Sequence, residues 1–307
     1  MLERKFYISR SFGFGQRLDV FLAAHVRDLT RAQAQKFIAE KKVLVNKKAS
    51  KPGQKLRAGD VIEVEIPREA PGFLCPEDIP LDVLHSDEHI IVINKPAGLT
   101  VHPGAGIEKG TLVNALLFHY PEIKKVGHPE RPGIVHRLDK ETSGVMVLAR
   151  SEKAYTELKR QFKAREVEKI YLGLVWGQIQ VAEGKIDWAL GRHPRHRQRI
   201  SIRTKKPREA LTLYSVKKIL DDFTLLEIKP VTGRTHQIRV HFAAAGHPIV
   251  GDPRYGGQDK TRKFPRLYLH AWRIVFAHPV TRILCEFYAP LPPEFQEIIH
   301  GSGDAHP

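Results

Sequence analysis

Apolar residues follow two different patterns over the first 66 residues of the chain. Over residues 17–42 they recur every three or four positions, which predicts two short helices. Thr30 is placed to cap the second of these helices. The runs that begin at Val43 and Val61 are rich in β-branched residues and predict strands with a turn between them. The pattern therefore predicts a small α+β unit over residues 1–66.

A proline-rich stretch separates this unit from the rest of the chain. Residues 67–80 read PREAPGFLCPEDIP, and proline stiffens a chain and removes backbone donors. We therefore expect a linker at 67–80 between a small domain, 1–66, and a larger one, 81–307. A chain of 307 residues is long enough for one domain of each size.

The larger part reads mainly as strands with helices between them. The runs LDVLHS and HIIVINK predict two strands, and TLVNALLFHY predicts a helix. A longer amphipathic helix is predicted after Ser151, which is a suitable N-cap. Further strands lead to a last helix at PPEFQEII.

The stretch GIVHRLDKETSGVMVLAR, residues 133–150, places a polar loop between two apolar runs. The runs at 134–135 and 145–149 predict buried strands, so 136–144 is the loop between them. Asp139 lies close to the end of the first strand, where a rigid sheet can position a catalytic group. The residues also fit a polar turn held by local side-chain-to-backbone hydrogen bonds.

A hydrolase site is another interpretation of this loop. His136, Asp139 and Ser143 are the residue types of a catalytic triad. However, triad members usually come from distant segments, and the G-x-S-x-G pattern that presents a nucleophilic serine does not occur. A hydrolase is therefore disfavoured.

Tyr171 interrupts an otherwise apolar strand. In EKIYLGLVWG it shares a face with Gly173 and Val175, because side chains alternate along a strand. A tyrosine in this setting usually belongs to the core, with its hydroxyl hydrogen-bonded. The pattern alone therefore gives Tyr171 a structural role.

Arg239 lies within a predicted helix, THQIRVHFAAA, that Gly246 ends. Ile238, Phe242 and Ala245 are expected to face the core. Arg239 then lies on another side, where it would be an ordinary surface cation.

Positive charge is in large excess. The chain has 50 Lys and Arg against 34 Asp and Glu, a formal net charge of +16, which favours a polyanionic partner such as nucleic acid. A membrane surface also fits the charge, but no apolar run has transmembrane length and no signal peptide is apparent. The two cysteines, the lack of C-x-x-C and the lack of H-E-x-x-H favour neither a disulfide nor a zinc site, as is typical of a cytosolic protein.

The cations are concentrated in two places that we expect to contact RNA phosphates. One is the second predicted helix, with Arg31 and Lys36. The other is a loop or hairpin over residues 189–208, which contains no acidic residue. Its cations include Arg192, Arg195, Arg197 and Arg199.

Several of these stretches resemble motifs of the RluA-type pseudouridine synthases. HRLD with ETSG around Asp139, KIYLGLVWG around Tyr171 and TGRTHQIRVH around Arg239 are similar to three motifs of that family, and NKPAG with VHPG is similar to another. The first 66 residues resemble the S-four-like RNA-binding module in RLDVFLAA, the basic helix, VLVN and the AGD turn. The resemblance implies an α+β fold, in which a catalytic domain with a mixed, mainly antiparallel sheet and peripheral helices follows a small S-four-like α+β domain.

The resemblance also implies roles for individual residues. Asp139 would be the catalytic nucleophile, Arg239 would pair with it, and Tyr171 would pack against the target base. Arg137 would stack on the RNA or fill the space left by a flipped base, with a phosphate contact as the alternative. The pocket would be lined by Leu138 and Ile238.

The reaction implied by the resemblance breaks the N1–C1′ bond of uridine and joins C1′ to C5, so no metal, nucleotide or redox cofactor is expected. GRHP and VGDPRYGG favour the branch that modifies large-subunit ribosomal RNA. The expected partner is that RNA or a pre-ribosomal particle, and the expected protein is a cytoplasmic monomer. One alternative is a non-catalytic ribosome-assembly factor, disfavoured because all three site residues are present. Another is a synthase for tRNA or several RNAs, which the sequence leaves open.

Overall fold

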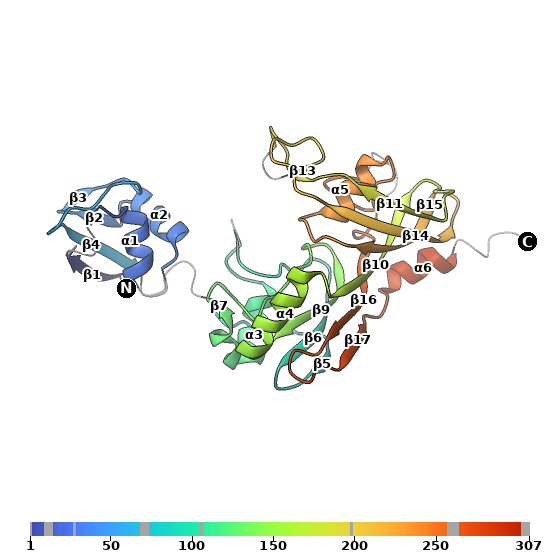
Figure 1. Ribbon diagram of the computed structural model, residues 1–307, viewed down its shortest axis with the longest axis horizontal. Coiled ribbons are helices and arrows are strands. Elements are labelled where there is room, and N and C mark those ends of the chain that lie inside the picture. Colours follow the sequence, from blue (N-terminus) through green and yellow to red (C-terminus); the bar gives the residue numbers. More distant parts are fainter. Residues whose placement is uncertain are drawn as a thin grey trace, which may run out of the picture. The chain divides into compact units, whose positions relative to one another are not determined.

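The computed structural model describes residues 2–8, 15–26, 29–67, 74–104, 107–196, 199–256 and 264–301. The chain divides into two compact units, which are described separately: Met1–Cys75 with Gly104–Glu108, and Pro76–Pro103 with Lys109–Pro307 (Figure 1). The division after Cys75 falls inside the predicted linker 67–80. Residues 68–73 of that linker lie outside the described residues, so the domain boundaries stay a prediction.

The first unit is a small sheet with two helices. Its elements are β1 (Leu2–Ile8), α1 (Leu18–His25), α2 (Arg31–Ala39), β2 (Val43–Val45), β3 (Lys48–Ala49) and β4 (Val61–Pro67). The strands form an antiparallel sheet in the order β1-β4-β2-β3. Thr30 caps α2 through a capping box with Gln33, as the sequence predicts. Apolar residues of both helices and of β2 and β4 form one core.

The second unit contains the remaining elements. They are β5 (Val83–Ser86), β6 (Ile90–Lys95), α3 (Leu112–His119), the 3-10 helix η2 (Pro121–Lys125), β7 (Gly127–His128), β8 (Arg131–Pro132), β9 (Ser143–Ala149), α4 (Glu152–Ala164), β10 (Glu168–Trp176), β11 (Glu183–Asp187), β12 (Gly191–Arg192), β13 (Ile200–Ser201), β14 (Leu211–Ile219), β15 (Phe223–Pro230), α5 (Gln237–Ala244), β16 (Leu269–Ala277), β17 (Leu284–Tyr288) and α6 (Pro293–Gly301). The main sheet has the order β11-β14-β15-β10-β16-β9-β6-β5, and β17 pairs with β16. Its ladders are antiparallel except for β9 with β16, which confirms a mixed, mainly antiparallel sheet.

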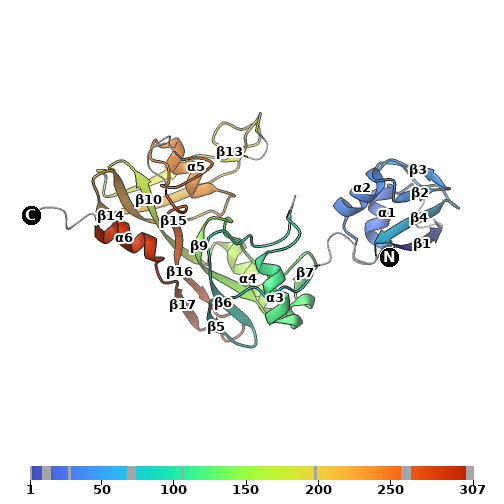
Figure 2. The same ribbon diagram turned by 180° about the vertical axis from the view of Figure 1, so that it is seen from behind.

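Alternation along the strands places α5 and α6 on opposite faces of the sheet. Val175 of β10 packs in one cluster with Phe242 of α5, whereas its neighbour Leu174 packs in another with Phe295 of α6. Figures 1 and 2 show the two helices on either side of β10 and β15. Tyr171 shares the α5 side with Val175, as predicted.

Gly144 allows β9 and β16 to approach closely. Its φ is +119°, and a Cβ built on it would lie 2.1 Å from the carbonyl oxygen of Ala271. A larger residue would therefore separate the strands at the end of the 136–144 loop.

Two local predictions are wrong. The run 134–135 is not a strand, because Ile134 makes only a single bridge to Leu148 before the chain turns into the loop. Ala245 is exposed beyond the end of α5 and does not face the core. Within the described part of the chain, no helix is both long and apolar enough to cross a membrane.

Candidate active site

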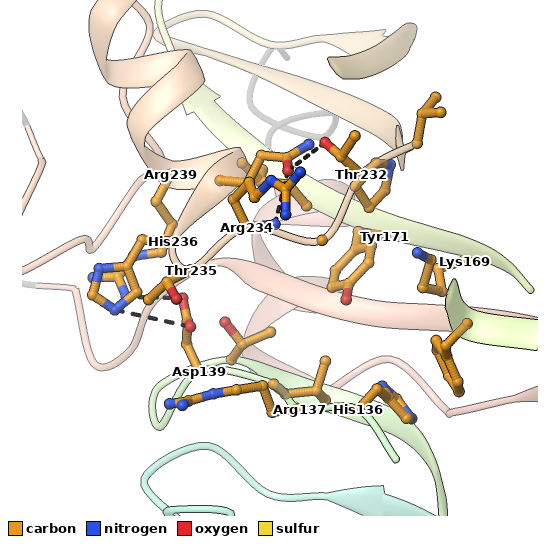
Figure 3. Close-up of a pocket in the computed structure, with 18 of the residues that line it drawn as sticks. His136, Arg137, Asp139, Lys169, Tyr171, Thr232, Arg234, Thr235, His236 and Arg239 are labelled. Atoms are coloured by element: carbon orange, nitrogen blue, oxygen red, sulfur yellow. Dashed lines mark hydrogen bonds and ion pairs between the residues drawn. The ribbon is translucent and has the colours of Figure 1, made fainter. Parts of the chain in front are cut away.

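A cavity of about 490 Å³ in the second unit gathers residues from four separate segments. These are the loop before β9, the start of β10 with the preceding end of α4, the segment from the end of β15 into α5, and Leu269 at the start of β16 (Figure 3). Residues named by the sequence analysis line it together: Arg137, Leu138, Asp139, Tyr171, Ile238 and Arg239. Leu138 and Ile238 are buried, so they form part of its apolar wall.

Arg239 is buried between two carboxylates. Its Nη1 donates to Asp139 Oδ2 at 3.2 Å, while Nε and Nη2 donate to Asp252 Oδ2 and Oδ1 at 2.7 and 2.8 Å. The side chain of Arg239 is 5% exposed, so the prediction of a surface cation is wrong. The pairing predicted from the resemblance is present, and a second carboxylate fixes the guanidinium in a fork.

The charges of Arg239 and Asp252 stabilise one another although both side chains are buried. Burial of Asp252 by itself would raise its pKa, but the hydrogen bonds and charge of Arg239 outweigh burial and lower it. Burial of Arg239 acts against its charge, and Asp252 and then Asp139 more than compensate, so its pKa is raised. Asp252 also accepts hydrogen bonds from the backbone N–H groups of Arg254 and Tyr255. The side of Arg239 away from Asp139 is therefore rigidly held.

His236 connects Asp139 to Tyr255. It has a left-handed φ of 53° just before α5, and its Nε2 lies 3.8 Å from Asp139 Oδ1. Its Nδ1 lies 2.8 Å from Tyr255 Oη, which accepts a hydrogen bond from the Ile200 N–H at 3.0 Å. The Tyr255 hydroxyl can donate its proton to Nδ1, and in that tautomer the ring proton of neutral His236 is on Nε2. Burial lowers the pKa of His236 and favours this neutral form.

Tyr171 faces the cavity. Burial raises its pKa and the charge of Asp139 raises it further, so the phenol stays protonated. Its hydroxyl makes no hydrogen bond with the residues described, unlike that of a satisfied core tyrosine. The ring and the hydroxyl are both available to a bound molecule.

Lys95 holds the loop that carries Asp139. It is fully buried, and its Nζ donates to the carbonyl oxygens of Pro96, Leu99 and Lys140 at 2.7, 2.9 and 3.1 Å. Lys95 is therefore a buried cation that binds backbone carbonyl groups, not a solvated one. Burial lowers its pKa to about 7, while three carbonyl acceptors match the three N–H bonds of an ammonium and favour the charged form.

The geometry does not support a hydrolase triad in the loop. Nε2 of His136 accepts a hydrogen bond from the Val147 N–H, and burial lowers the pKa of His136 to about 3. Ser143 is buried and contacts His270, with its Oγ 2.8 Å from Nδ1. His136 and Ser143 therefore belong to separate hydrogen-bond networks.

The cations that we predicted to contact RNA differ in their exposure and in their contacts with the protein. Arg137 is exposed at the cavity, and the small hairpin of β12 and β13 carries the exposed Arg192, Arg195 and Arg199. Arg197 lies outside the described residues. In the first unit Lys36 is 52% exposed, whereas Arg31 donates from Nε to the buried Asp19 at 3.0 Å and so also has a structural contact.

Sequence reasoning assigned no role to Asp252, Tyr255, His236 or Lys169, which contribute to the site. Asp252 and Tyr255 lie in the motif VGDPRYGG, and His236 lies in TGRTHQIRVH. These motifs indicated that the segments matter, but the contact between Asp252 and Arg239 depends on how the chain folds back after α5. Lys169 lies in the same strand as Tyr171 and lines the cavity.

These features place the chain in a known class of RNA-modifying enzymes. Residues 89–244 match the RNA pseudouridylate synthase family and residues 16–62 match the S4 domain. The chain belongs to the RNA pseudouridylate synthase family, so it is an isomerase that converts uridine to pseudouridine, with RNA as its partner.

The similar proteins cover nearly the whole chain. An uncharacterised RNA pseudouridine synthase of Aquifex aeolicus is 43% identical over 93% of each chain. The ribosomal large subunit pseudouridine synthase D of Xanthomonas campestris is 42% identical over 93% of this chain and 88% of its own. The structure of human RNA pseudouridylate synthase domain containing 1 is 30% identical, with a TM-score of 0.58, over 70% of this chain and 85% of that one.

Proposed function

We propose that the protein isomerises specific uridines of large-subunit ribosomal RNA, with Asp139 as the catalytic nucleophile. One observation carries the catalytic part: Asp139 lies in a cavity beside Tyr171 and is paired with Arg239, which Asp252 holds in place. The choice of RNA is supported by the similar protein named as a ribosomal large subunit synthase.

Each group in the cavity has a distinct task in this proposal. Arg239 donates to Asp139 and orients its carboxyl group, while the protonated Tyr171 packs against the uracil ring. Asp139 can add to C1′, assist elimination at C2′ to a glycal, or add to C6 of the base. All three routes require a carboxylate at the reacting nucleotide.

The target base must reach the cavity from structured RNA. Flipping a base costs a few kcal/mol, and Arg137 at the cavity is placed to stack on the RNA or fill the vacated space. The cations of the β12–β13 hairpin and of α2 contact backbone phosphates and position the RNA. Which uridine is modified then depends on the shape of the RNA.

The chemistry adds and removes no atoms overall, so we infer that the enzyme uses no metal, nucleotide or redox cofactor. We further propose that it acts as a cytoplasmic monomer on free ribosomal RNA or on a pre-ribosomal particle.

Tritium release tests the proposed function. Large-subunit ribosomal RNA, small-subunit ribosomal RNA and tRNA are transcribed with tritium at uridine C5, which pseudouridine formation releases into water. The protein is incubated with each RNA without metal or nucleotide and with a chelator. We expect release from large-subunit RNA only. Release from tRNA alone would contradict the proposed substrate. Absence of release from naked, fragmented and particle-bound RNA, with RNA binding intact, would favour an assembly factor.

A further inference from the structure

Lys169 is a half-buried cation of the cavity, and none of the described residues is an anionic partner for it. It precedes Tyr171 by two residues on β10, so both side chains leave the strand on the same face, and both line the cavity. Arg239 pairs with two carboxylates and Arg165 pairs with Glu209. Within the described ranges, Lys169 has no hydrogen bond or ion pair.

The surroundings of Lys169 favour an oxygen ligand. Burial lowers the pKa of its amine, and the positive charge of Arg165 lowers it further, with no carboxylate to compensate. Lys95, also buried, differs because three carbonyl groups satisfy it. The ammonium of Lys169 thus loses hydration without gaining an acceptor from the described residues, and a bound carbonyl or anion would supply one.

Lys169 lies at the opposite side of Tyr171 from Asp139. Figure 3 shows Tyr171 between the two residues. The electrostatics agree, because the charge of Asp139 acts on Tyr171, whereas the charge that acts on Lys169 is that of Arg165. If the ribose C1′ is at Asp139 and the uracil packs against Tyr171, the far edge of the base falls beside Lys169.

We propose that Lys169 donates a hydrogen bond to a carbonyl oxygen of the target uracil and stabilises the base while it carries negative charge. This inference rests on the proposed function. When the N1–C1′ bond breaks, its electron pair stays with uracil, and the charge spreads onto the ring nitrogens and both carbonyl oxygens. C1′ then bonds to C5, the C5 proton leaves and N1 takes up a proton, so the product is an isomer. Lys169 remains protonated throughout.

A phosphate of the RNA is the alternative ligand for Lys169. The two ligands predict different effects when Lys169 is replaced, one on RNA affinity and the other on the reaction rate. A phosphate contact contributes to affinity and to its salt dependence, and its loss lowers the salt slope by about 1. A contact with the uracil anion exists mainly after bond cleavage begins, so it contributes to the rate at saturating RNA. The half-buried position of Lys169, deeper than the exposed Lys163 and Arg137, favours the base.

The test compares Lys169→Met with wild type and with Lys153→Met, the same change at an exposed lysine of α4 outside the cavity. Single-turnover tritium release is measured at saturating RNA, together with the dissociation constant at several salt concentrations. We expect the rate of Lys169→Met to fall about 100-fold, as for loss of one donor to developing charge, with affinity and salt slope unchanged. Lys169→Arg keeps the charge and should recover most of the rate.

A Lys169→Met rate within about three-fold of wild type would overturn the inference, as would a defect confined to affinity with a reduced salt slope. Lys169→Gln serves the same purpose if the methionine variant does not fold. Inactive wild type on every RNA would overturn the proposed function as well, whereas an active wild type with an active Lys169→Met enzyme overturns this inference alone.

Discussion

The shared position of Arg239 between Asp139 and Asp252 is the main finding at the scale of single residues. A guanidinium that is held by only one carboxylate can swing away, whereas the two-point contact with Asp252 leaves Nη1 directed at Asp139. Asp252 is fully buried and does not line the cavity, so it acts through Arg239 and is a positioning residue.

Asp252→Asn should separate positioning from RNA binding. The amide keeps the shape but removes the charge that compensates buried Arg239, so we expect a loss of roughly 3 kcal/mol in unfolding free energy. The turnover rate should fall at least ten-fold, with the RNA dissociation constant within a few-fold of wild type. Thermal unfolding, single-turnover tritium release and filter binding measure the three quantities. A normal rate in the folded variant would show that Asp252 does not position Arg239 for the reaction.

At the scale of elements, Tyr255 joins the basic β12–β13 hairpin to the start of α5. Its hydroxyl contacts the Ile200 N–H and His236, and its ring lies 5.3 Å from the Arg239 guanidinium. The hairpin that we propose to bind RNA is therefore in contact with groups that surround Asp139. This side chain would connect the proposed RNA contact to the arrangement of the site.

Tyr255→Phe removes only the hydroxyl and keeps the ring beside Arg239. We expect a fall of about ten-fold in the rate at saturating RNA, because His236 loses the partner that fixes its tautomer. The matched control is Tyr155→Phe, on α4 and away from the cavity lining. Equal rates for both variants at saturating RNA would show that the hydroxyl does not position the site.

Most elements could be predicted from the sequence because their signals are local. The alternation along β10 and the cap of α2 depend on a few neighbouring residues, and both are present. The run 134–135 is not a strand because β6 pairs with one edge of β9 from Gly144 to Ala149, and at the other edge Ile134 makes a single bridge to Leu148. Local β-propensity does not report which edge is free.

The site was only partly predictable for a related reason. Asp139, Tyr171 and Arg239 were named because their motifs resemble those of a family, whereas periodicity alone made Arg239 a surface cation. The burial of Arg239 depends on Asp252, which reaches it from a loop after α5. Lys95 was missed because the three carbonyl groups that bind it come from two loops. Contacts of this kind are tertiary and leave no spacing signal.

At the scale of the whole molecule, the net charge of +16 contributes to the affinity for RNA more than to the isomerisation step. Among the described residues, some cations have protein partners, such as Arg239 and Arg31, and others are exposed, such as those on the β12–β13 hairpin. The exposed hairpin cations can release counterions from RNA without breaking a contact inside the protein.

Removal of the hairpin cations should weaken binding without altering the chemical step. In the triple variant Arg192→Gln, Arg195→Gln, Arg199→Gln, we expect the slope of log affinity against log salt to fall by up to about 3, with the rate at saturating RNA unchanged. The control neutralises three exposed lysines of η2 and α4, Lys124, Lys125 and Lys153. If the control lowers the slope as much as the hairpin variant does, the hairpin is not a specific RNA contact.

The measurement that tests the central claim most directly is tritium release by Asp139→Asn. This change keeps the size of the side chain and its place beside Arg239 but removes the nucleophilic carboxylate. We expect no release above background in single-turnover reactions with large-subunit RNA, while RNA affinity stays within about three-fold of wild type and the fold is retained. Release by the folded variant at a rate close to that of wild type would contradict the account, because the carboxylate of Asp139 would then not be required for the reaction.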